Sequence, residues 1–156
     1  MENADRQKKV LPAPLLVLVC LLLSLAAQLL HPVRLLPDFG IVGVLAGIVV
    51  CIASLAVGLS GVREFKRHNT PTNPFQPTTA LVTSGVFRYT RNPMYLGFVA
   101  LFLGIAIAVN SLAFLIAAVL LAALLQIAVI RSEEHFLSVK YGSEFEAYRA
   151  RTRRWI

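Results

Sequence analysis

The sequence is poor in cysteine and lacks any metal-binding pattern. Its two cysteines, Cys20 and Cys51, each lie within a long apolar run. No CxxC pair and no cluster of cysteine with histidine occurs, which argues against a zinc site or a disulfide framework. We interpret both cysteines as small residues of an apolar core and expect no metal.

Charge is missing from three long stretches of the chain. Leu11–Leu30, Phe39–Val62 and Met94–Ile130 contain no charged residue, and the last is 37 residues long. A helix that crosses a bilayer needs about 20 apolar residues, so the last stretch suffices for two crossings with a turn at Asn110-Ser111. We predict an all-α polytopic membrane protein with four transmembrane helices, at about 11–30, 39–61, 94–109 and 112–131.

The first apolar stretch could also belong to a signal peptide. Lys8-Lys9 would then form the basic region and the neighbourhood of Ala26-Ala27 the cleavage site. However, the stretch is longer than the roughly 7–15 residues of a signal core. We therefore expect a retained first helix.

Acidic residues are also few, and the basic residues are distributed unevenly. Eight acidic residues face fifteen Lys and Arg, for a net charge of +7, and Arg34 alone among the basic residues lies between the first two apolar stretches. The other basic residues fall before the first helix, between the second and third, or after the fourth. The positive-inside rule then places both termini in the cytoplasm, with the inner membrane as the location in a bacterium. An anionic leaflet explains this asymmetry better than nucleic acid does, so we expect no nucleic-acid partner.

Two segments lie outside the apolar stretches: a long connection between the second and third helices, and the tail after the fourth helix. The connection 63–91 contains Pro71, Pro74 and Pro77, which disfavour a regular helix, and connections of such length are usually functional or disordered. In the tail, the fourth helix is expected to continue to a stop at Gly142. Ser143 and Glu146 have the spacing of a capping box for a short last helix, with Phe145 and Tyr148 as its apolar stripe.

Polar residues mark the helix starts and one helix end. Asp38 and Asn92 are suited to the N-cap position of the second and third helices, and Pro93 to the first helical position. A membrane helix with a good N-cap and flanking arginines would by itself account for the residues of RNPMYLG, without any functional role. Glu133-Glu134 follows the fourth helix; on a helix the two are about 100° apart, so at most one points cleanly into a shared pocket. A solvated helix surface is the simpler interpretation of this pair.

Three elements in order resemble a known enzyme family. The segment TPTNPFQPTTALVTSGVFRYTRNPMYLG, followed by EEHFLSVKYGSEFEAYRARTRRWI, is similar to the isoprenylcysteine carboxyl methyltransferases. The related phospholipid N-methyltransferases share the general pattern. The matching elements are LVT-x-G, R-N-P-x-Y-x-G and E-E-x-x-L-x-x-x-Y-G, and the resemblance covers about residues 70–156.

The resemblance implies an integral membrane enzyme that takes a methyl group from S-adenosylmethionine. It implies one domain over 1–156, with two helices in 1–62 and the catalytic part in 63–156. The chain has no GxGxxG, so the pocket must come from the central loop, the start of the third helix and the tail. The resemblance implies cofactor contacts at Thr79, Ala80, Leu81, Val82, Phe87, Asn92, Pro93, Met94, Tyr95 and Glu133. We also predict cofactor contacts at Gly85 and Tyr89, and catalytic roles at Arg91, Arg131 and Glu134.

The acceptor stays open. The chain most resembles enzymes that methylate the carboxyl group of a prenylcysteine, but Val129 stands where the family has its substrate arginine, and Arg131 is the nearest basic residue. Phe87 also replaces a tyrosine. A phospholipid amine or a small thiol are alternatives, and His135 or Tyr141 would then be the candidate bases. A non-enzymatic four-helix membrane protein or transporter is a further alternative, although no ionisable residue lies deep in a predicted span.

Overall fold

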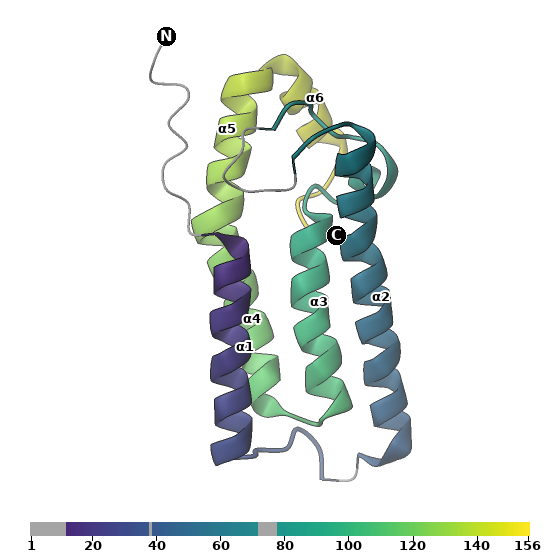
Figure 1. Ribbon diagram of the computed structural model, residues 1–156, viewed down its shortest axis with the longest axis vertical. Helices are drawn as coiled ribbons and strands as arrows, with labels where there is room; N and C mark the ends of the chain where they lie inside the picture. The colour runs from purple at the N-terminus through teal and green to yellow at the C-terminus, as the bar shows by residue number, and fades with distance from the viewer. Residues whose placement is uncertain (1–11, 38, 72–77) are drawn as a thin grey trace.

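In the computed structural model, the described residues 12–37, 39–71 and 78–156 form helices joined by turns and loops (Figure 1). It contains no strand, and only isolated backbone bridges occur outside the helices. The π-helix η2 joins α4 to α5, so that Leu112–Tyr141 is one continuous helix. The elements are α1 (Ala13–Leu30), α2 (Gly40–Arg67), η1 (Gly85–Arg88), α3 (Pro93–Ala108), α4 (Leu112–Leu124), η2 (Leu125–Ile130), α5 (Arg131–Tyr141) and α6 (Ser143–Arg151).

Three of these helices are long and apolar enough to cross a membrane. They are Ala13–Leu30, Gly40–Arg67 and the continuous helix Leu112–Tyr141. The prediction of a helical membrane protein is confirmed, but a fourth span is not established. α3 has 16 residues, and at 1.5 Å per residue it is about 24 Å long, less than the roughly 30 Å of a hydrocarbon core.

α3 packs closely along α2 through glycines (Figure 1). A Cβ on Gly47 would lie 2.3 Å from the backbone nitrogen of Ala108, and one on Gly104 would lie 2.6 Å from Cys51 Sγ. A Cβ on Gly97 would lie 3.0 Å from the Cα of Gly58. Small residues allow backbones of membrane helices to approach in this way. Gly47 thus allows the two backbones to approach, and Cys51 is the small neighbour that Gly104 accommodates.

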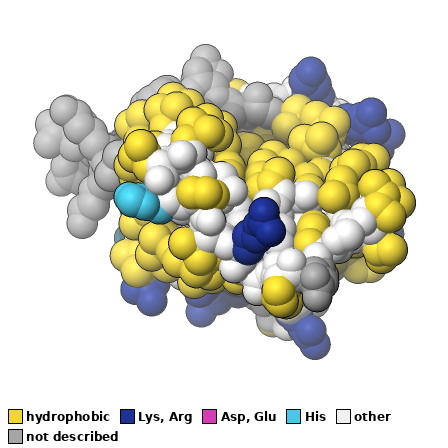
Figure 2. Space-filling model, turned by 90° about the horizontal axis from the view of Figure 1, so that it is seen from below, with side chains coloured by type: hydrophobic (Ala, Val, Ile, Leu, Met, Phe, Trp, Pro, Cys, Tyr) yellow, Lys and Arg dark blue, Asp and Glu magenta, His cyan; other side chains and the backbone are white. Residues whose placement is uncertain are grey.

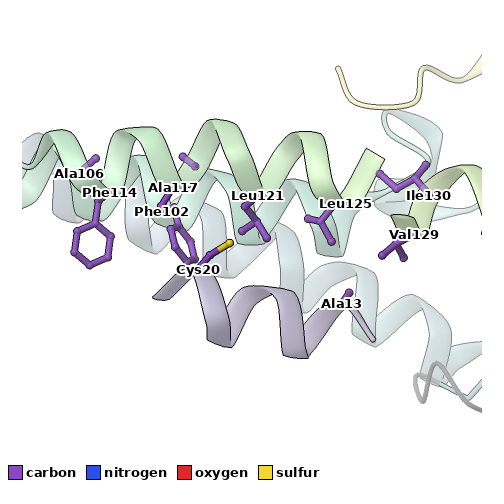
Figure 3. Packing of buried hydrophobic residues seen from close by; sticks show 11 residues of the cluster. Ala13, Cys20, Phe102, Ala106, Phe114, Ala117, Leu121, Leu125, Val129 and Ile130 are labelled. Atoms are coloured by element: carbon purple, nitrogen blue, oxygen red, sulfur yellow. The ribbon is translucent and has the colours of Figure 1, made fainter. Parts of the chain in front are cut away.

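α1 packs against α4, and the apolar core lies among α1, α3 and α4 (Figure 3). Cys20 from α1 and Phe102 from α3 are buried in it together with Leu121 and Leu125. Both cysteines are free, as expected. The predicted turn between α3 and α4 is confirmed: Asn110 has a φ of +51°, and Ser111 accepts a hydrogen bond from the backbone N–H of Phe114.

The two ends of the bundle differ. η1, α5 and α6 gather at the end where α2 finishes (Figure 1). Seen from the opposite end, hydrophobic side chains cover most of the face, a basic side chain lies near its middle, and no acidic one is in view among the coloured side chains (Figure 2). The end with η1, α5 and α6 therefore carries the groups from which a polar site can be built.

Several predicted boundaries need correction. α2 continues to Arg67, so the start of the expected loop is helical. Gly142, with a φ of +51°, ends α5 as predicted. The capping box is wrong: α6 begins directly after Gly142, whose carbonyl accepts from the N–H of Glu146, while the Glu146 carboxylate accepts from Ser138. Asn92 occupies the N-cap position, but its side chain bonds elsewhere. Asp38 lies outside the described residues.

Candidate active site

A cavity opens between the start of α3, the start of α5 and the segment that leads into η1. The volume open to the centres of water-sized molecules is about 140 Å³. All the empty space, including the open mouth of the cavity, is about 990 Å³. The cavity is therefore a narrow cleft with a mostly apolar wall. The described lining residues are Phe65, Pro71, Thr78, Ala80, Leu81, Val82, Phe87, Arg91, Asn92, Pro93, Met94, Tyr95, Glu133, Glu134, Phe136, Leu137, Phe145 and Tyr148.

Glu133 is held in the cavity wall by Tyr95. Pro93 starts α3 at its first position, which places Tyr95 in the first turn of that helix. Glu133 lies in the first turn of α5, three residues beyond the uncharged stretch that ends at Ile130. The Tyr95 hydroxyl donates a hydrogen bond of 2.6 Å to Glu133 Oε1. This bond fixes the carboxylate group without neutralising it by an ion pair.

Glu134, the next residue, faces a different set of partners. Arg91 Nη2 lies 2.8 Å from Glu134 Oε1, and Arg154 Nε lies 3.0 Å from the same oxygen. The side chains of Arg91 and Glu134 are 9% and 12% exposed, against 36% for Arg154. The hydrogen bond to Glu134 raises the pKa of Arg154 further above its usual value. The predicted catalytic residues Arg91 and Glu134 thus lie together in a buried ion cluster with one surplus positive charge.

The C-terminal segment crosses the start of α3. The backbone N–H of Arg91 donates to the Arg153 carbonyl, and both Thr90 Oγ1 and Asn92 Nδ2 donate to the Arg154 carbonyl. Trp155 Nε1 donates to Gln126 in the π-helix η2. Sequence analysis missed this arrangement, although the Arg-rich tail and the polar residues before α3 are the two halves of it.

An aromatic wall closes the side of the cavity formed by η1 and α6. Phe87, Phe145 and Tyr148 are buried together with Val82, and Phe65 stacks on Phe87 with ring centroids 5.3 Å apart. The Tyr148 hydroxyl donates to the Phe87 carbonyl at 2.8 Å. Burial raises the pKa of Tyr148 to about 12, so the hydroxyl stays protonated and keeps this bond. The expected apolar stripe of α6 therefore packs into the protein.

Thr78 is a lining residue that sequence analysis missed. Its hydroxyl is buried and has no hydrogen-bond partner among the described residues. Lys140 Nζ and the Tyr141 hydroxyl both donate to the Thr78 carbonyl, which holds this residue against α5. A buried hydroxyl without a partner is costly unless a ligand or water satisfies it. Thr78 is thus a candidate ligand contact in place of its neighbour Thr79.

The structure brings most of the predicted site residues together, but four lie apart. Thr79 donates to the Asn69 carbonyl outside the cavity wall. Gly85 lies against Glu64, Tyr89 is 79% exposed, and Arg131 is exposed. The predicted residues that do line the cavity are Ala80, Leu81, Val82, Phe87, Arg91, Asn92, Pro93, Met94, Tyr95, Glu133 and Glu134.

The family comparison agrees with the resemblance seen in the motifs. The model of the phospholipid methyltransferase family matches residues 42–144, about two thirds of the chain. The matched range includes α3, the Glu133-Glu134 pair and most of α2, and it ends just after Gly142. No curated protein and no solved structure matches the chain.

Proposed function

Because the chain belongs to the phospholipid methyltransferase family, we propose that it transfers a methyl group from S-adenosylmethionine to an acceptor carried by a membrane lipid. The observation that carries the proposal is the placement of opposite charges around one cleft. Glu133, held by Tyr95, and Arg91, held by Glu134, both line it. Membership of the family supports methyl transfer. The opposite charges of Glu133 and Arg91 support S-adenosylmethionine as the methyl donor.

The cavity residues fit the chemistry of S-adenosylmethionine. Glu133 would pair with the ammonium group, and Arg91, which belongs to a cluster with one surplus positive charge, would attract the carboxylate. The orphaned Thr78 hydroxyl offers a further polar contact. The buried ring of Phe87 and its aromatic neighbours would exclude water and offer faces for the adenine. Bound there, the donor would supply an electrophilic methyl group on a sulfonium centre.

A groove on the membrane side of the site supports a lipid-borne acceptor. It is lined almost wholly by apolar residues of α1, α2 and α3, and it leaves about 310 Å³ for the centres of water-sized molecules. Met94 and Tyr95 line both this groove and the cavity. An acyl or prenyl chain in the groove would thus bring its polar end to the cavity. On this proposal α3 is the fourth crossing, and both termini lie in the cytoplasm.

The charges favour an amine acceptor over a carboxylate. Among the described residues, Arg91 is the one basic side chain that lines the cavity. If Arg91 holds the carboxylate of the methyl donor, no second cation is left for an acceptor carboxylate. Val129, at the position of the family's substrate arginine, is buried in the apolar core. We therefore place a phospholipid amine first and a prenylcysteine carboxylate second; the second requires Arg91 to serve the acceptor.

Mass spectrometry of the products tests the proposal. The purified protein in lipid nanodiscs is incubated with S-adenosylmethionine that carries a trideuterated methyl group, with either phosphatidylethanolamine or N-acetyl-S-farnesylcysteine as acceptor. We expect label in the phospholipid headgroup, with one S-adenosylhomocysteine and one proton, lost from the headgroup ammonium, released for each methyl transferred. Label in farnesylcysteine alone would replace the first acceptor by the second. No label in either, and no binding of S-adenosylmethionine by calorimetry, would overturn the proposal.

A further inference from the structure

A second pocket is lined by polar and charged residues. It is lined by Thr83, Ser84, Arg88, Arg151 and Thr152, and it leaves about 430 Å³ for the centres of water-sized molecules. None of these five residues lines the candidate active site. Each of its two arginines is close in sequence to a residue of the wall, Arg88 to Phe87 and Arg151 to Tyr148. The pocket therefore lies between η1 and the end of α6, separate from the cleft with Glu133.

The pocket carries positive charge that the described residues leave uncompensated. Arg88 and Arg151 are both exposed, and neither has a carboxylate within 4.0 Å in the described part of the chain. Glu64 approaches the pocket, but its carboxylate accepts from Ser84 Oγ and from Arg67 Nη1, each at 2.7 Å. Two guanidinium groups beside the Thr83 and Thr152 hydroxyls form a donor set suited to an anion.

Donors occupy several carbonyl groups at the C-terminal end of α6. Carbonyl groups at a helix C-terminus carry partial negative charge and would repel an anion. Here Arg91 Nη1 donates to the carbonyls of Arg149 and Thr152, and the Tyr148 carbonyl accepts from the Thr152 N–H. The carbonyl groups of Tyr148, Arg149 and Thr152 are thus occupied by donors, which reduces the partial negative charge at this end of the helix.

The depth of the pocket indicates where the anion comes from. Ser84 is bonded to Glu64, and Glu64 lies two residues beyond Val62, where the uncharged stretch of α2 ends. At 1.5 Å per residue Glu64, which holds the lining residue Ser84, lies about 3 Å beyond the apolar part of the helix. This is the level of the lipid headgroups, which extend for several Å on each side of the hydrocarbon core.

We propose that this pocket binds the phosphate group of an anionic membrane lipid, held between Arg88 and Arg151. Arginine is suited to this role because its planar fork can donate two hydrogen bonds to one phosphate. The bound lipid would join η1 to α6. The proposal concerns a site separate from the methyl-transfer cleft and does not depend on the proposed function.

Binding of a short-chain lipid tests the proposal without any methyl donor. The purified protein in zwitterionic detergent micelles is titrated with dioctanoyl phosphatidic acid, and bound lipid and melting temperature are measured. The pocket variant is Arg88→Gln/Arg151→Gln. The control variant is Arg63→Gln/Lys66→Gln, which removes the same charge from exposed residues at the same end of α2.

We expect saturable binding that raises the melting temperature of the wild-type protein. The dissociation constant should rise at least tenfold in the pocket variant and less than twofold in the control. If lipid binding weakens equally in both variants, the lipid is attracted by the general positive charge of the surface, and the site is overturned. Inorganic phosphate that competes as well as the lipid would overturn the lipid assignment. Absence of saturable lipid binding would overturn the proposal. Binding of S-adenosylmethionine, measured separately, tests the proposed function alone.

Discussion

The Tyr95 hydroxyl donates a hydrogen bond of 2.6 Å to Glu133 Oε1 across 38 positions of sequence. It links the first turn of α3 to the first turn of α5 at the place where both helices reach the cavity. Glu134, one residue later, turns to Arg91 and Arg154 instead. Two adjacent carboxyl groups that line one cavity therefore have different partners: among the described residues Glu133 is held by a tyrosine hydroxyl and Glu134 by two arginines.

The first prediction concerns the carboxylate of Glu133. Glu133→Gln keeps an acceptor for Tyr95 but removes the charge that would pair with the ammonium of S-adenosylmethionine. A hydrogen bond to a charged group contributes about 1.5–3 kcal/mol, so the dissociation constant measured by calorimetry should rise roughly 10-fold to 100-fold. Glu144→Gln removes the same charge from the exposed first turn of α6 and is the control. Wild-type affinity in Glu133→Gln would show that the ammonium binds elsewhere.

The second prediction concerns stability at Glu134. Glu134→Ala leaves Arg91, whose side chain is 9% exposed, without its carboxylate. Breaking a buried ion pair costs about 3–5 kcal/mol, but the partial exposure of Arg154 lowers the expected loss to about 2–4 kcal/mol. The free energy of unfolding in mixed micelles measures it.

The exposed pair Glu146–Arg149 provides the comparison for Glu134. Its two side chains are about half exposed, and Oε1 of Glu146 lies 3.5 Å from Nη1 of Arg149. Glu146→Ala should therefore cost less than about 1 kcal/mol. If Glu134→Ala and Glu146→Ala cost the same, the buried cluster does not stabilise the end of the bundle.

The helices and their ends could be predicted from the sequence because their causes are local. Absence of charge over twenty or more residues predicts a membrane helix, and Gly142 and Asn110 supply the left-handed φ values of the two turns. The exception is α3, whose membrane crossing cannot be decided from apolarity alone because the helix is short. This helix of 16 residues packs against α2 through glycines whose partners lie some forty to sixty positions away.

The site could be predicted only where the motif residues themselves meet. The motifs predict one pocket beside the Glu133-Glu134 pair and RNPMYLG, and both glutamates and Arg91–Tyr95 line the same cavity. The crossing of the tail over α3 could not be foreseen, because it depends on backbone carbonyls of Arg153 and Arg154 that carry no sequence signal. Thr78 was missed for a similar reason, since one position decides which threonine faces inward.

The third prediction concerns the contact between α2 and α3. Gly47→Ala would place a methyl group 2.3 Å from the backbone nitrogen of Ala108, which cannot move aside as a flexible side chain could. Overpacking of this kind typically costs about 1–3 kcal/mol. Gly58→Ala is the matched control, because its Cβ would meet its nearest neighbour at an ordinary 3.9 Å. Equal melting temperatures for the two variants would contradict the close approach of the helices.

The last prediction separates two neighbouring threonines. Thr78→Val removes a buried hydroxyl that has no partner among the described residues, so stability should be unchanged or rise, while the affinity for S-adenosylmethionine should fall about threefold to tenfold if that hydroxyl contacts the ligand. Thr79→Val removes a hydrogen bond of 2.9 Å to the Asn69 carbonyl outside the cavity. It should cost up to about 1 kcal/mol of stability and leave affinity unchanged. Calorimetry and thermal unfolding of both variants measure the two effects, and the opposite pattern would assign the ligand contact to Thr79.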